Sequence, residues 1–215
     1  RGAFIAAGIS CILTALRTEP IANVFGAFFV GPVVSYVLAV VFLGETPSRS
    51  RGLLLALGFV GVLFVVKPGF GASVGMVFAL AAGGCYGAYL MMTRVVAGVY
   101  RPRFLLMSQL IVGSVLLTPF GLSVDMPDLG LPVLALIGLS ALGSACGNFL
   151  LVVASKTAEA SLIAPLVYSQ LFSATVAGLL VFGDWPDVFA LAGLVLIAVS
   201  GFGSLFIHHK QMRRA

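Results

Sequence analysis

Charged residues are scarce in this chain. They make up 9% of its 215 residues, whereas a typical soluble domain has about 25%, and hydrophobic residues make up 60% with a mean hydropathy of +1.16. A soluble protein of this length surrounds its core with a charged surface, and 12 basic with 7 acidic residues are too few for that. The composition excludes a soluble globular fold and predicts a membrane-spanning protein.

Cysteine and histidine are also few, and their spacing supports neither a disulfide framework nor a metal site. Cys11, Cys85 and Cys146 lie in three separate apolar runs. His208 and His209 are adjacent, beside basic residues, and have no matching ligands elsewhere. We therefore expect no metal and no cofactor.

The position of the few charges excludes further classes of function. No Asp, Glu, Lys or Arg lies deep in an apolar run, so an intramembrane enzyme lacks the acids and bases it needs, and we expect no catalytic residues. The net charge is +5, but the basic residues form no patch interleaved with aromatics. Nucleic acid is therefore not an expected partner.

The apolar runs between polar breaks predict an all-α membrane protein, a polytopic bundle of about eight transmembrane helices. Short connecting segments that contain turn residues such as Pro and Gly separate the runs. The predicted helices span residues 2–17, 20–43, 52–66, 73–93, 104–123, 131–154, 160–182 and 188–207.

Lysine and arginine fall mainly on one side when the connecting segments are assigned alternately to the two faces of the membrane. Ten lie on the first side and two, Arg17 and Lys67, on the second. The excess of basic residues predicts that the first side, with the C-terminus, is cytoplasmic. The ten are Arg1, Arg49, Arg51, Arg94, Arg101, Arg103, Lys156, Lys210, Arg213 and Arg214.

A sequence motif recurs at an offset of 139 residues. Residues 42–47, Phe-Leu-Gly-Glu-Thr-Pro, correspond to residues 181–186, Val-Phe-Gly-Asp-Trp-Pro. Glu45 lies on the predicted inner side and Asp184 on the outer side, so the helices before them cross the membrane in opposite directions. The pattern predicts an inverted repeat, which commonly places a substrate site between the two halves.

These residues resemble the EamA-type members of the drug/metabolite transporter superfamily. The resemblance implies ten helices in two repeats of five, a bacterial inner-membrane location, and a permease for small organic solutes such as amino acids or vitamins. It rests on three segments: Gly44-Glu45-x-Pro47, Gly183-Asp184-x-Pro186 and Ala164-Pro165-Leu166.

The family has ten helices and this chain has eight predicted spans, so we expect the chain to be truncated at its N-terminus. Three predicted spans fall within residues 1–70, which we interpret as an incomplete first repeat. Five fall within residues 71–215, the second repeat, which ends in a basic cytoplasmic tail at 208–215. In the family the first helix helps to line the central cavity, so the sequence leaves open whether this chain alone is active.

The sixth predicted span has a polar face. Ser140, Ser144 and Asn148 recur every four residues, which places them on one side of a helix. The amide of Asn148 offers donors and an acceptor that would suit a solute carboxylate or amide. Interhelical hydrogen bonds are the alternative role for Asn148 and Ser144.

The fourth and seventh spans supply the other candidates for solute binding. Tyr168 and Gln170 follow Pro165, which removes a backbone donor and favours a bend near the middle of the membrane. Tyr86 and Tyr89 are three residues apart and can share a helix face for ring stacking. A purely structural role remains the alternative for each tyrosine. The motif Gly83-x-x-x-Gly87 is more typical of close helix packing.

The sequence therefore favours a secondary transporter that recognises its solute through amides, hydroxyls and rings. A scaffold that does not transport and an intramembrane enzyme are the alternatives. The expected partners are a small-molecule solute and the lipid bilayer, and the sequence leaves open whether the protein forms a homo-oligomer.

Overall fold

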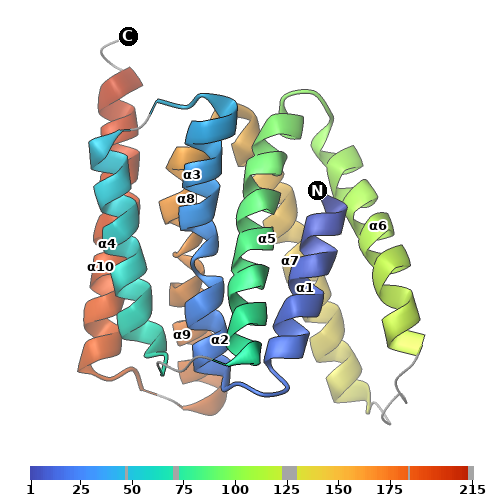
Figure 1. The fold of residues 1–215 in the computed structure, drawn as a ribbon. Helices are drawn as coiled ribbons and strands as arrows, with labels where there is room; N and C mark the ends of the chain where they lie inside the picture. The colour runs from blue at the N-terminus through green and yellow to red at the C-terminus, as the bar shows by residue number, and fades with distance from the viewer. Residues whose placement is uncertain (47, 70–72, 123–129, 184, 213–215) are drawn as a thin grey trace.

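The computed structural model describes residues 1–46, 48–69, 73–122, 130–183 and 185–212, and every regular element in these ranges is a helix (Figure 1). The predicted all-α fold is confirmed. The helices are α1 (Gly2–Ala15), α2 (Ile21–Phe28), α3 (Gly31–Leu43), α4 (Arg49–Val66), α5 (Val74–Ala97), α6 (Pro102–Leu122), α7 (Leu131–Thr157), α8 (Ala160–Val167), α9 (Gln170–Phe182) and α10 (Val188–Met212).

The eight predicted spans correspond one for one to helical segments. Seven segments within the described ranges are long and apolar enough to cross a membrane, and α1 is a shorter apolar helix of 14 residues. Several helices continue beyond the predicted run, for example α5 to Ala97 and α7 to Thr157. Hydropathy marks only the part in hydrocarbon, whereas the backbone hydrogen bonds continue into the polar interface.

Two of the spans are broken near their middle. Phe29 and Val30 separate α2 from α3, and Tyr168 and Ser169 separate α8 from α9. The offset of 139 residues pairs the two breaks residue for residue. In Figure 1 the chain runs upward through α2 and α3 and downward through α8 and α9, so the two broken helices are antiparallel.

Proline and glycine account for these local structures. Pro32 lies at the second position of α3, where its missing N–H costs little, and Pro165 lies three residues before the second break. Gly44 and Gly183, which the offset also pairs, end α3 and α9 with φ of 66° and 73°. This left-handed conformation favours glycine.

Some predictions concern residues outside the described ranges. Pro47 and Asp184 of the two repeated motifs lie there, as do the boundary between residues 70 and 71 and the end of the basic tail at 213–215. The division into two repeats therefore stays a prediction, although the paired breaks agree with it.

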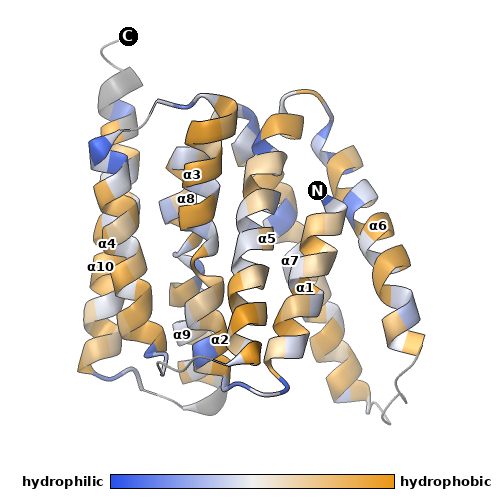
Figure 2. Cartoon of the chain, viewed as in Figure 1, coloured by the Kyte–Doolittle hydropathy of each residue, from blue (hydrophilic) through white to orange (hydrophobic). Residues whose placement is uncertain are grey.

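The bundle presents an apolar surface along most of its height. Figure 2 shows hydrophobic residues along the helices and hydrophilic residues mainly near their ends. Many large apolar side chains point outward, such as Leu131 and Leu180. In water this surface would be strongly unfavourable, whereas lipid tails solvate it. The protein is therefore an integral, multi-pass membrane protein.

Helices α4 and α10 approach each other closely at two glycines. A Cβ atom added to Gly61 would lie 2.7 Å from the carbonyl oxygen of Gly193, and one added to Gly193 would lie 2.5 Å from the carbonyl oxygen of Gly61. The two backbones are thus in direct contact. Small residues permit such close packing between helices in lipid, where dispersion contacts replace the hydrophobic effect.

Replacing Gly61 by leucine is expected to lower the free energy of unfolding by about 1–3 kcal/mol, because the larger side chain forces α4 and α10 apart. Thermal unfolding in detergent measures this change. Gly121→Leu is the control, since a Cβ atom at Gly121 meets nothing within 4 Å. Equal midpoints for the two variants would contradict the close contact.

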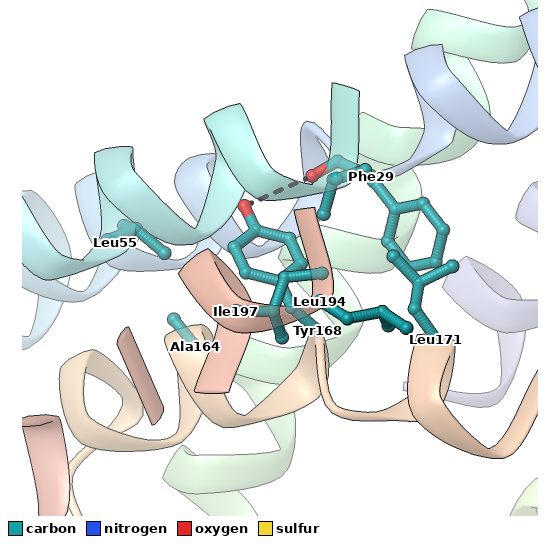
Figure 3. Packing of buried hydrophobic residues seen from close by; sticks show 8 residues of the cluster. Phe29, Leu55, Ala164, Tyr168, Leu171, Leu194 and Ile197 are labelled. Atoms are coloured by element: carbon teal, nitrogen blue, oxygen red, sulfur yellow. Dashed lines mark hydrogen bonds between the residues drawn. The ribbon is translucent and has the colours of Figure 1, made fainter. Parts of the chain in front are cut away.

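The main core cluster surrounds Tyr168, which is fully buried at the second break (Figure 3). Its hydroxyl donates a hydrogen bond of 3.3 Å to the carbonyl oxygen of Phe29 in the first break, and the two rings meet edge to face with centroids 6.1 Å apart. The two breaks are therefore joined to each other. The cluster consists of Phe29, Leu55, Val62, Ala164, Tyr168, Leu171, Leu194 and Ile197.

Two carboxylates, the partly buried Glu19 and the exposed Asp187, lie in the connections at the lower end of the bundle in Figure 1. Ser73 and Asn23 donate hydrogen bonds to Glu19, and Lys67 donates to Asp187. These bonds favour the ionised forms and lower the pKa of both carboxyls below their usual values. Both groups therefore stay charged near neutral pH.

Candidate functional site

A cavity of about 710 Å³ lies between α1, α5, α6 and α7. Its volume is in the range of about 300–1,000 Å³ that is usual for small-molecule sites. The walls are mostly apolar, with a few polar groups. Those are Tyr86, Gln109, Ser114, Thr118, Ser144 and Asn148.

A hydrogen-bond network closes one end of this cavity. The Tyr89 hydroxyl lies 2.6 Å from Oδ1 of Asn148 and 3.0 Å from Oε1 of Gln109, and its single hydrogen can be donated to only one of them at a time. Asn148 also donates a hydrogen bond of 2.9 Å to the backbone carbonyl of Ser144. The two amides therefore have alternative partners, and a solute can take a place in the network without leaving a polar group unpaired.

The guanidinium of Arg1 supports this network. It donates to the Tyr89 hydroxyl, to Oγ1 of Thr93 and to the carbonyl oxygen of Leu105, each at 2.8 Å, and it lies 4.9 Å from the centroid of the Tyr89 ring. Within the described ranges, none of the hydrogen bonds made by Arg1 goes to a carboxylate. The cation therefore gives this end of the cavity a positive potential, which favours electron-rich groups of a solute.

Three aromatic rings form a row along the cavity. Phe28, the last residue of α2, lies against Tyr86 with ring centroids 4.9 Å apart. Tyr86 in turn stacks on Tyr89 at 6.0 Å with an interplanar angle of 16°. The row connects the first helix break to the polar network.

A second cavity of about 680 Å³ lies on the other side of Phe28, between α2, α9 and the end of α4. Gln170 is its polar wall residue, and among the described residues no side-chain hydrogen bond partner satisfies the Gln170 amide. The other walls are apolar, including Phe25 and Phe29. Phe28 thus belongs to the walls of both cavities.

The structure brings three of the predicted site residues to the first cavity. Asn148, Ser144 and Tyr86 line it, and Tyr89 lies behind its wall. Gln170 faces the second cavity. These positions agree with the predicted roles without testing them.

The predicted role of Tyr168 in solute binding stays a prediction. The residue lies in the packed core, with no exposed surface, and none of the described cavities has it in its wall. Its hydroxyl bonds to the backbone of the other break instead. The structural alternative considered for this tyrosine fits the observed geometry. The Gly83 and Gly87 packing prediction is confirmed, because a Cβ at either would lie within 2.8 Å of the backbone between Phe28 and Gly31.

Two residues of the site are absent from the sequence-based candidates. Gln109 is 7% exposed within α6, and an amide in an apolar span is the feature that drew attention to Gln170. The same argument would have found Gln109. No sequence feature identifies Phe28, because it is one of 17 phenylalanines in the chain. Only its position in the structure shows that it belongs to the site.

No group of three potential metal ligands occurs within the described part of the chain. The cysteines are free thiols, with Cys11 and Cys85 partly buried and Cys146 exposed. What this site offers is rings, amides and one cation. It is suited to binding an organic solute.

Comparison with known proteins identifies relatives along the whole chain. The sequence model of the EamA-like transporter family matches residues 73–206. The riboflavin transporter of Rhizobium johnstonii is 29% identical, with 97% of this chain and 68% of that protein aligned. The S-adenosylmethionine uptake transporter of Rickettsia felis is 25% identical, with 100% of this chain and 73% of that protein aligned.

The fold also occurs in a protein of known crystal structure. The TM-score is 0.79 at 17% sequence identity, and the match covers 96% of this chain and 75% of the other. At that identity the likeness concerns the arrangement of helices alone.

Proposed function

The chain belongs to the EamA-like transporter family, and on that premise we propose that it is a permease that moves a small organic metabolite across a membrane by alternating access. The observation that carries this proposal is the pair of broken helices. Interrupted spans at corresponding positions of two inverted halves are the best structural pointer to a transport site at their interface. Here the two breaks touch each other, and a cavity lies on each side of Phe28 beside them.

The proposed solute carries a planar ring system that contains nitrogen. The relatives named above are transporters of riboflavin and of S-adenosylmethionine, and both molecules have such a ring. The row of Phe28 and Tyr86 offers faces for stacking, and Gln109 with Asn148 offers donors and acceptors for the ring edge. The guanidinium of Arg1 adds a positive potential that suits ring nitrogens and carbonyl oxygens.

The proposed orientation follows the distribution of basic residues. Connections α3–α4 and α5–α6 lie at the same end of the bundle as the end of α10 (Figure 1). This end holds most of the Lys and Arg residues, so we place it in the cytoplasm of a bacterial inner membrane. Labelling of Ser48→Cys by an impermeant reagent outside intact cells would reverse this assignment.

The proposal is tested by uptake into liposomes that contain the intact protein. Labelled riboflavin, S-adenosylmethionine, amino acids and nucleosides are supplied outside, and initial rates are measured against concentration. We expect saturable uptake of at least one solute with a ring, and competition by others of that class. Uptake that saturates for no solute would refute transport, and saturable uptake of solutes without a ring alone would refute the proposed class.

Asn148→Ala is expected to raise the KM for the transported solute about fivefold, because one hydrogen bond at the network is worth about 1 kcal/mol. Thr14→Ala is the matched control, since Thr14 is an exposed polar residue of α1 that bonds only to the backbone of its own helix. Both variants are checked for membrane insertion. If Asn148→Ala transports with the same KM as Thr14→Ala, Asn148 does not contact the solute.

A further inference from the structure

A carboxylate near the end of α3 caps the beginning of α8. Glu45 accepts hydrogen bonds from the backbone N–H groups of Ala160 at 2.9 Å and Ser161 at 3.0 Å. The residue at the helix boundary, Glu159, makes no side-chain cap of its own. The first N–H groups of a helix lack partners within it and carry partial positive charge, so a carboxylate from elsewhere stabilises them. The cap spans 115 residues of sequence.

Arg51 of α4 reinforces this cap. Its side chain is only 7% exposed and forms an ion pair with the carboxylate of Glu159. It also donates a hydrogen bond of 3.0 Å to the hydroxyl of Ser161. Ser161 itself is 1% exposed. Two residues that follow α3 therefore hold the first turn of α8 from two directions, and they close the bundle at the end where the α3–α4 connection lies. We define Glu45, Arg51, Glu159 and the first two residues of α8 as the latch.

At the opposite end, the start of α2 lacks an equivalent cap among the described residues, although Lys67 and Asp187 form an ion pair in the connections there. The offset of 139 residues pairs Ala160 and Ser161 with Ile21 and Ala22 at the start of α2. There Ile21 is 67% exposed, whereas Ala160 is 3% exposed, and Pro20 gives α2 no side-chain cap. Ile21 and Ala22 also line the second cavity. The start of α8 is thus capped and buried, whereas Ile21 at the start of α2 is exposed beside the second cavity.

We propose that the latch is the closed gate on the side of the α3–α4 connection and that Glu45 is the positioning residue that holds it shut. Release of the solute on that side requires the first turn of α8 to separate from Glu45 and Arg51. The latch joins residues that the predicted repeat assigns to different halves, so rocking of one half against the other makes or breaks it. Its role in transport rests on the proposed function, whereas its effect on accessibility does not.

The experiment uses Ala160→Cys in the intact protein with Cys11, Cys85 and Cys146 replaced by serine. Ala160 keeps its backbone N–H in this variant, so the cap remains. The rate of labelling by a water-soluble maleimide is measured in liposomes. Loss of the cap by Glu45→Ala is expected to raise that rate about fivefold, since a helix cap contributes about 1 kcal/mol.

Two controls separate opening from unfolding. Glu19→Ala removes a carboxylate at the other end of the bundle and should leave the labelling rate at Ala160→Cys unchanged. Ala82→Cys, at a position with no exposed surface in α5, should stay unlabelled in Glu45→Ala. Labelling at Ala82→Cys as well would mean unfolding, and the test then uses Glu45→Gln, which keeps one acceptor and should raise the rate by a smaller factor.

An unchanged rate in both Glu45 variants overturns the latch. A raised rate in a protein that transports no solute supports the latch and refutes the proposed function, so the two failures are distinguishable. If the protein transports, Glu45→Ala should also lower net uptake, because one gate no longer closes. Normal uptake together with a raised labelling rate would show that Glu45 has no part in gating.

Discussion

Tyr168→Ala is expected to lower the free energy of unfolding by about 3–5 kcal/mol, the cost of removing a large buried aromatic side chain. The tyrosine has no exposed surface and packs at the point where α8, α4 and α10 meet the first break. A Cβ atom on Gly58 of α4 would lie 2.8 Å from its ring, so neighbouring atoms already fill the space around it.

Tyr168→Phe separates the ring from the hydroxyl. This variant keeps the packing but leaves the carbonyl oxygen of Phe29 without the hydrogen bond from Tyr168, and it should cost about 1 kcal/mol. Tyr100→Ala serves as the control, because Tyr100 is 49% exposed and its loss should change stability by less than about 0.5 kcal/mol. Unfolding in detergent measures all three. A Tyr168→Ala midpoint equal to that of Tyr100→Ala would refute the joining of the two breaks.

The spans were predictable because the bilayer imposes a strong and simple requirement. A helix in hydrocarbon needs a long apolar run, and polar residues interrupt such runs only at its ends. The breaks were harder to place. Pro165 pointed to a flexible span, but Pro32 and Pro165 are not paired by the repeat, whereas the breaks at Phe29 and Tyr168 are. The two breaks contact each other, a relation that the positions of the prolines do not reveal.

The candidate site was predictable only where a residue was unusual for its surroundings. Asn148 stood out as an amide in an apolar helix, and it lies in the cavity wall. Phe28 is an apolar residue, the usual kind in membrane spans. It belongs to the candidate site because it lies in the walls of two cavities. Tyr168 had the chemistry of a binding residue but is enclosed by other helices. Hydropathy and residue spacing do not show which helices pack against each other.

The repeated Gly-acid motif illustrates the same limit. From sequence, Gly44 and Glu45 indicated a helix end followed by a turn. The left-handed conformation of Gly44 confirms the helix end, while the carboxylate bonds to the start of α8. Such a partner, 115 residues away, follows from tertiary contacts. The motif thus combines a local role in backbone geometry with a long-range role in closing the bundle.

Phe28→Ala is expected to raise the KM for a solute with a planar ring about 30-fold, equivalent to about 2 kcal/mol for a well-packed aromatic contact. The ring of Phe28 lies tilted against Tyr86 and forms part of the wall of both cavities. Its removal takes away one face of the proposed stacking site and joins two spaces of about 710 and 680 Å³. Discrimination against bulkier ring solutes should fall in the same variant.

Uptake into liposomes measures both effects, with Phe42→Ala as the control because Phe42 is 71% exposed on α3. Phe28→Trp keeps an aromatic face and should retain a KM within a few-fold of the original value. An aliphatic residue of similar size, in Phe28→Leu, fills part of the gap but offers no ring, so its KM should resemble that of Phe28→Ala. If leucine restores the KM as well as tryptophan does, Phe28 acts by volume, and stacking does not determine the solute class.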